Sequence, residues 1–289
     1  MNTKIFKPVF VGIFLFSAAC FGQDQYSYRG FDSPVSVTQY GGYYYLSNSG
    51  KNFGSAVKDG DGYISRIRSD GSQEDAQKYI TGLNNPRGIF VIQGTLYICD
   101  IDRLVGIDLR TKNQVFELSF AKEKTTQLTE ITSLNNKTVY LSATDINVIF
   151  EVDLTSKKYV KWTETLSPTG LLIDNHQMYV CSMGTDSLPN GKIGVIDMKT
   201  KKYKPLANDE GIFWGLALHG KKLYYSDWVQ FAKRGVIKWI DLDTLSDHEV
   251  TFTSKIAGPA GFVYDARNDL FIIPAVLEGV VFGCIGFGK

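Results

Sequence analysis

The feature that most constrains this chain is an internal repeat with a nearly constant register. A short lead-in segment, an apolar stretch, a tight polar turn and a stretch centred on an aromatic residue recur six times. The third lead-in residue precedes the aromatic residue by 9 positions in five copies and by 10 in the sixth. The aromatic residues are Tyr45, Tyr97, Tyr140, Tyr179, Tyr224 and Phe271. Such self-similarity is typical of solenoids and propellers.

A second landmark in the middle copies is an aspartate followed by Leu or Met. Successive aspartates are 45, 44 and 44 residues apart, which is the length of a four-stranded propeller blade. An aspartate at the end of a strand can accept hydrogen bonds from the backbone and open a turn. We therefore interpret four residues as turn formers: Asp108, Asp153, Asp197 and Asp241.

The repeat predicts an all-β fold, a six-bladed β-propeller of four-stranded antiparallel blades with strands a to d. The 16 Tyr and 18 Phe suit strands. The sixth copy lacks a strand d, and the alternating Tyr26-Ser27-Tyr28 segment is available to close the ring. We expect the propeller to span 23–289, with blades at about 31–80, 81–121, 122–165, 166–209, 210–253, and 254–289 completed by 24–30.

The N-terminus predicts a signal peptide over 1–22. Lys4 and Lys7 precede an apolar run at 8–16 and then small residues, and the run is too short to span a bilayer. We therefore expect an extracytoplasmic protein, periplasmic or secreted. The alternative is a lipid anchor at Cys20, although the usual lipobox has Leu where this chain has Ser17. No later stretch is apolar for long enough to predict a transmembrane helix.

Charge and histidine content exclude several function classes. The 31 Lys+Arg nearly balance the 30 Asp+Glu, so no uniform field favours nucleic acid as a partner. The three histidines fall in or near turns on one face, which disfavours a histidine metal cluster or a Ser/His/Asp triad. Cys99, Cys181 and Cys284 show no CxxC spacing, and we expect them to be small buried residues on strands.

Loop lengths indicate which face of the propeller binds. The a–b and c–d turns share one face, and the b–c loops and lead-in segments share the other, which we call the b–c face. The a–b spacing is constant, whereas the distance from the strand-b aromatic to the end of strand c varies from 11 to 23 residues. Variable loops on a rigid scaffold usually carry binding sites. In the first blade, Lys51-Asn52-Phe53-Gly54 is long enough to reach over the mouth of the central channel.

The middle residues of the lead-in segments should ring that mouth: Val35, Arg87, Glu130, Thr169, Trp214 and Ala260. Arg87 and Glu130 belong to neighbouring blades and form either an ion pair or an anchor for a polar ligand. Trp214 is either a stacking platform or a plug. The predicted ligand-binding set is Asp32, Arg87, Glu130, Thr169, Trp214, Asp100, Asp227 and Trp228. Its carboxylates are oxygen ligands of the type that calcium prefers, although loop aspartates also form turns.

The repeat register, with Leu-Tyr-Ile-Cys-Asp at 96–100 and Leu-Tyr-Tyr-Ser-Asp at 223–227, resembles the NHL and senescence-marker-protein/gluconolactonase-like propellers. The resemblance covers essentially the whole mature chain and implies a divalent cation in the channel, held by a Glu-x-Pro glutamate and by later Asn and Asp residues. Asp32-Ser33-Pro34 matches the first motif with a shorter acid, but Thr169 and Trp214 replace the other ligands.

Three functions are compatible with these observations, and the third is a purely structural role. The first is a non-catalytic module that binds a small polar molecule, peptide or protein partner on the b–c face. The alternative is a divalent-metal-dependent lactonase or related hydrolase with an altered site at Asp32 and Glu130, holding calcium or another divalent cation. An enzyme of this kind depends on its cation, whereas a binding module should be indifferent to chelation.

Overall fold

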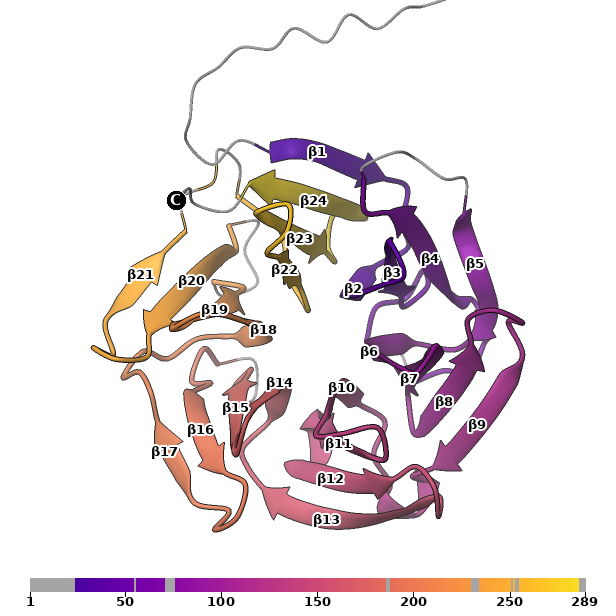
Figure 1. Cartoon of the computed structure of the whole chain (residues 1–289), viewed down its shortest axis with the longest axis horizontal. Helices are drawn as coiled ribbons and strands as arrows, with labels where there is room; N and C mark the ends of the chain where they lie inside the picture. The colour runs from indigo at the N-terminus through magenta and orange to yellow at the C-terminus, as the bar shows by residue number, and fades with distance from the viewer. Residues whose placement is uncertain are drawn as a thin grey trace, which may run out of the picture.

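Six four-stranded antiparallel sheets surround a common axis, as Figure 1 shows. The computed structural model describes residues 24–54, 56–70, 76–185, 188–229, 234–250, 252 and 255–285. The expected signal peptide at 1–22 and Cys20 lie outside these residues. The predicted all-β six-bladed propeller is confirmed.

Within each blade the strands run outward from the axis in the order a to d, and strand a is innermost. The blades are β2 (Pro34–Tyr40), β3 (Tyr43–Asn48), β4 (Gly62–Arg68) and β5 (Ala76–Leu83); β6 (Pro86–Ile92), β7 (Thr95–Asp100), β8 (Arg103–Asp108) and β9 (Gln114–Ser119); β10 (Leu128–Ser133), β11 (Thr138–Ala143), β12 (Val148–Asp153) and β13 (Lys158–Glu164); β14 (Pro168–Asp174), β15 (Gln177–Ser182), β16 (Ile193–Asp197) and β17 (Tyr203–Pro205); β18 (Phe213–His219), β19 (Lys222–Asp227), β20 (Val236–Asp241) and β21 (Asp247–Glu249); and β22 (Val263–Asp265), β23 (Leu270–Ala275), β24 (Val280–Ile285) and β1 (Asp24–Arg29).

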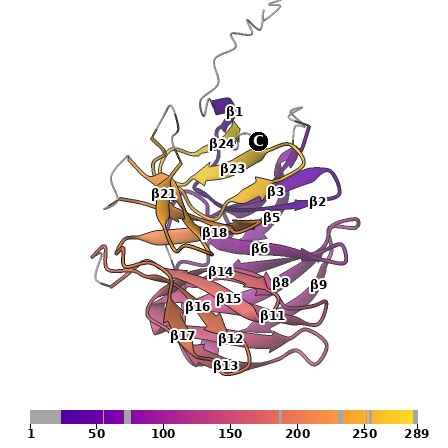
Figure 2. The ribbon, with the colours of Figure 1, turned by 60° about the vertical axis from the view of Figure 1, so that its left-hand side comes forward.

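The ring is closed by the N-terminal strand, as the sequence predicted. β1 pairs antiparallel with β24, with Tyr28 opposite Val281 and Ser27 opposite Phe282. The two strands lie side by side in both views (Figure 1 and Figure 2). The pairing covers an edge of β24 that would otherwise expose unpaired backbone groups.

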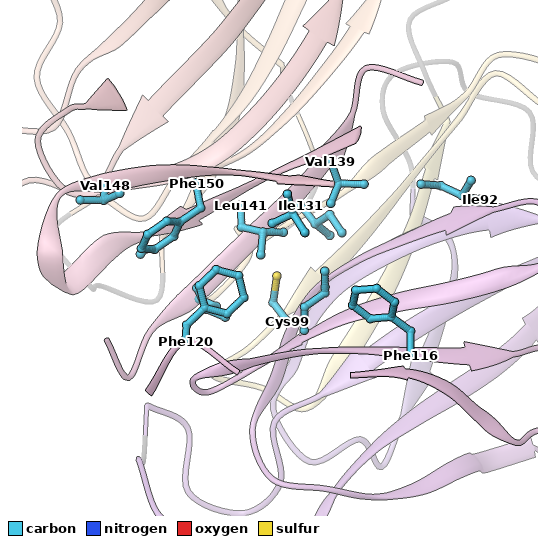
Figure 3. Close-up of a cluster of buried hydrophobic side chains, with 13 residues drawn as sticks. Ile92, Cys99, Phe116, Phe120, Ile131, Val139, Leu141, Val148 and Phe150 are labelled. Carbon is cyan, nitrogen blue, oxygen red and sulfur yellow. The ribbon is translucent and has the colours of Figure 1, made fainter. Parts of the chain in front are cut away.

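Apolar side chains fill the spaces between blades. Figure 3 shows one such cluster, where Cys99 lies among Phe116, Phe120, Leu141 and Phe150 from the second and third blades and the segment that joins them. All three described cysteines are buried, as expected: Cys99, Cys181 and Cys284. Cysteine here behaves as a small apolar residue.

Side chains two positions after the strand-b aromatic also join each blade to the next through hydrogen bonds. The donor–acceptor pairs are Cys99 Sγ to the Glu130 carbonyl (3.7 Å), Ser142 Oγ to the Thr169 carbonyl (2.7 Å), Cys181 Sγ to the Trp214 carbonyl (3.3 Å) and Ser226 Oγ to the Ala260 carbonyl (3.2 Å). Each acceptor is the middle residue of the next lead-in segment. These bonds therefore hold the predicted mouth residues in place around the axis.

The four repeated aspartates form turns, as predicted. Asp153 Oδ1 accepts the backbone N–H groups of Thr155 and Ser156, both at 2.8 Å. Equivalent bonds are made by Asp108, Asp197 and Asp241. These bonds lower the pKa of all four carboxyl groups.

Helical structure is minimal in the described residues. Two short 3-10 helices, Ala121–Glu123 and Thr144–Ile146, lie in connections of the b–c face. No described helix has the length and apolar character needed to cross a membrane.

Candidate binding face

An aromatic stack closes the centre of the b–c face. The indole rings of Trp214 and Trp228 stack at 5.2 Å with an interplanar angle of 17°. Phe53 lies 5.9 Å from Trp214 and 6.0 Å from Trp228. Since Phe53 belongs to the first blade and the tryptophans to the fifth, which are not neighbours, the loop after β3 reaches across the axis. The sequence-based expectation for the loop around Phe53 agrees with this contact.

Both tryptophans are covered rather than open. Trp214 is 3% exposed and Trp228 is 1% exposed. The Trp228 Nε1–H donates to the Pro259 carbonyl at 2.8 Å, which satisfies its buried polar atom. Of the two alternatives for Trp214, the geometry therefore matches the plug.

The residues around the axis divide into an apolar half and a polar half. Val35, Trp214 and Ala260, from the first, fifth and sixth blades, pack in one apolar cluster that Phe53 covers. The second, third and fourth blades contribute Arg87, Glu130 and Thr169. The ring is thus amphipathic, with the charged groups gathered on one side.

Arg87 is a buried guanidinium, only 4% exposed. Its Nε donates to Asn85 Oδ1 at 3.4 Å, and its Cζ lies 5.8 Å from the Phe53 ring centroid. Burial lowers the pKa of Arg87 to about 10, so the side chain stays positively charged at neutral pH. Among the described residues, no carboxylate forms an ion pair with it.

Glu130 points from the third blade across the axis. A Cβ atom on Gly88 would lie 2.7 Å from Glu130 Oε1, and one on Gly261 would lie 3.2 Å from Oε2. The Ile131 N–H donates to Oε1 at 3.0 Å. Burial raises the pKa of Glu130 to about 8, so this carboxyl group is mostly neutral at pH 7. The predicted alternative of an Arg87–Glu130 ion pair is not formed.

The Thr169 hydroxyl is buried between two backbone carbonyl groups. Its Oγ1 is 2.8 Å from the Phe213 carbonyl and 3.0 Å from the Cys181 carbonyl, and the residue is fully buried. A hydroxyl enclosed in this way holds the fourth and fifth blades together.

Asp100 and Asp227 hold the backbone of the b–c face. Asp100 Oδ1 accepts the N–H groups of Asn84 and Asn85, and Oδ2 forms an ion pair with Arg103 at 2.8 Å. Asp227 accepts the Val229 N–H at 2.9 Å and lies 3.4 Å from Lys238 Nζ. Both carboxylates therefore have internal partners.

Asp32 lies beside a cavity of about 190 Å³ on the first blade. Its Oδ2 accepts the Tyr63 hydroxyl at 3.3 Å, and the wall also includes Lys51, Asp61 and Lys78. Sequence analysis missed Tyr63 and Lys78, because neither interrupts the pattern of its strand.

Asp32 and Glu130 have separate surroundings and share no partner. In the described part of the chain, no group of three or more His, Cys, Asp or Glu is arranged to hold a metal ion. The described carboxyl groups therefore do not assemble the donor set that calcium needs. A cation at Asp32 and Glu130 is still only a prediction from the sequence.

The loops of the b–c face also expose apolar side chains that sequence analysis missed. Val57 is 62% exposed and Leu188 is 55% exposed, in the loops after β3 and β15. Leu166 and Leu277 are exposed on the same face. Hydrophobic content alone cannot identify such residues, because the same residue types form the strands.

Comparison with known proteins identifies the fold. No family model and no curated protein matches the chain. Hydrazine synthase of Kuenenia stuttgartiensis is similar with a TM-score of 0.59 and 14% identity, over 85% of this chain and 74% of that chain. A chain of a nidogen/laminin complex is similar with a TM-score of 0.57 and 12% identity, over 88% and 92%. The finer resemblance to NHL and gluconolactonase-like propellers has no matching family model, and these comparisons show a six-bladed β-propeller fold.

Proposed function

We propose that this propeller is a non-catalytic extracytoplasmic module that binds a protein or peptide partner on its b–c face. The observation that carries the proposal is the closure of the ring axis by Phe53, Trp214 and Trp228. With its centre plugged, this face offers a partner a surface of loops around buried charges. Loops held on a rigid scaffold are suited to that task.

Two further observations support a partner protein. Val57 and Leu188 present apolar surface on the loops of this face, and partner interfaces commonly bury such side chains. One of the similar propellers is part of a nidogen/laminin complex, which is an assembly of proteins. The signal-peptide pattern at 1–22 supports a location outside the cytoplasm.

The test is capture of partners by the mature chain from an envelope and culture-supernatant extract. The b–c variant carries Val57→Asp and Leu188→Asp. The matched control carries Tyr40→Asp and Leu134→Asp, which are exposed on the opposite face. A partner retained by the wild type and the control but lost by the b–c variant supports the proposal. Loss only with the control variant overturns it.

Chelation separates this function from the hydrolase alternative. Capture should be unchanged by EDTA, because the proposed recognition uses side chains of the protein alone. Capture that depends on calcium or manganese would contradict the proposed mode of binding.

A further inference from the structure

Among the described residues, no carboxylate contacts the guanidinium of Arg87 in an ion pair. A guanidinium carries five N–H donors. Only the Nε–H has a hydrogen-bond partner among the described residues, the amide oxygen of Asn85. Burying a charged group without an opposite charge is costly, so such groups are normally paired.

Neither Glu130 nor Asp145 forms an ion pair with Arg87. Glu130 is mostly neutral at pH 7 and faces Gly261 on the far side of the axis. Asp145 exerts an attraction on Arg87, but its oxygens accept bonds from Thr125 Oγ1 at 2.6 Å and from the Thr126 N–H at 2.7 Å. Asp145 therefore offsets part of the charge of Arg87 from a distance, but it does not satisfy the terminal N–H donors.

The terminal nitrogens of Arg87 are not completely enclosed. Neither is among the fully buried polar atoms without a partner, so each keeps a small contact with solvent, and the whole residue is 4% exposed. Phe53 covers the guanidinium on one side, and its ring also touches the tryptophan stack. Low-dielectric aromatic walls strengthen an electrostatic contact made at such a position.

We propose that Arg87 anchors a carboxylate group of the ligand, an acidic side chain or a C-terminus of the partner, beside the half-buried ring of Phe53. The planar guanidinium fork matches a carboxylate with two parallel hydrogen bonds, which gives both strength and orientation. The partly exposed Phe53 ring accepts the apolar part of the residue that carries the carboxylate. This inference rests on the proposed function and names the chemistry that the b–c face recognises.

The probe for this site is benzoate, a carboxylate on an aromatic ring, compared with benzamide, its uncharged analogue of the same shape. Binding is followed by tryptophan fluorescence, which reports on Trp214 and Trp228, and by the midpoint of thermal unfolding. Benzoate should give a saturable fluorescence change and raise the midpoint. Benzamide should do neither.

The variant Arg87→Met keeps an unbranched stem and removes the charge, and it should abolish the response to benzoate. Arg110→Met removes an exposed arginine from the opposite face and should leave the response intact. Arg87→Lys keeps the charge but loses the fork, and it should weaken benzoate binding by about tenfold or more.

Equal responses to benzoate and benzamide would show an adventitious additive only and overturn the inference. The absence of any response of the wild type to benzoate would also overturn the inference, and this result does not depend on whether a variant folds. Partner capture lost by Val57→Asp and Leu188→Asp but kept by Arg87→Met would retain the proposed function and reject the carboxylate anchor. If the b–c variant, with Val57→Asp and Leu188→Asp, captures the partner as the wild type does, the proposed function itself is rejected.

Discussion

Replacing Glu130 with glutamine should stabilise the protein at high pH and leave it nearly unchanged at low pH. Burial raises the pKa of Glu130 from about 4.5 to about 8. Between these values the native state holds a proton that the unfolded state has released. The free energy of unfolding of the wild type therefore falls as pH rises through this window.

The size of the effect follows from the shift. One pKa unit corresponds to about 1.36 kcal/mol, so ionising Glu130 in the native state destabilises the protein by at most about 5 kcal/mol. Part of the Glu130 side chain retains contact with solvent, which screens the penalty. We expect the free energy of unfolding of Glu130→Gln to exceed that of the wild type by about 2 to 5 kcal/mol at pH 9. At pH 5 the two free energies should agree within about 1 kcal/mol.

Urea unfolding of both proteins at pH 5, 7 and 9 measures these differences, and groups that titrate in both proteins cancel in the comparison. Glu278→Gln, at an exposed glutamate in the loop after β23, is the matched control and should not reproduce the gap, since an exposed carboxyl group has no burial penalty. The reasoning is refuted if Glu130→Gln differs from the wild type by the same amount at pH 5 and pH 9.

Three further predictions concern the fold and the aromatic plug. Ser226→Ala should lower the free energy of unfolding by about 1 to 3 kcal/mol, because the Gly215 N–H and the Ala260 carbonyl lose their shared partner. Ser226→Cys should lower it by less, and an equal loss for both variants in urea unfolding would contradict this. Phe53→Ala should shift tryptophan emission to longer wavelength, since it uncovers the stack, and an unchanged spectrum would place the loop elsewhere. Deleting residues 24–29 should lower the thermal midpoint by several degrees by exposing β24, and an unchanged midpoint would mean that β1 does not close the ring.

The fold was predictable because its repeat has a steric cause. In four blades the third lead-in residue is a glycine that abuts the next lead-in segment. A Cβ atom on Gly170 would lie 2.4 Å from the Trp214 carbonyl oxygen, and one on Gly215 would lie 2.4 Å from that of Ala260. The same close approach recurs along the ring, so the sequence records it at a constant spacing.

The site was only partly predictable, because its chemistry depends on contacts between different blades. The sequence placed Arg87 and Glu130 in neighbouring blades, but their rotamers decide whether they pair. The Glu130 carboxyl group lies between Gly88 and Gly261 and forms no ion pair with Arg87. Similarly, Asp100 and Asp227 were visible as carboxylates at strand ends, whereas their bonds to Asn85 and Lys238 depend on loop conformation.

The most direct test of partner recognition on the b–c face is hydrogen exchange of the mature chain with and without its captured partner. Slower exchange confined to segments 49–54, 188–192 and 276–279, which belong to the b–c loops, is the predicted result. Protection of the a–b turns at 41–42 and 134–137, with the b–c loops unchanged, would contradict the account.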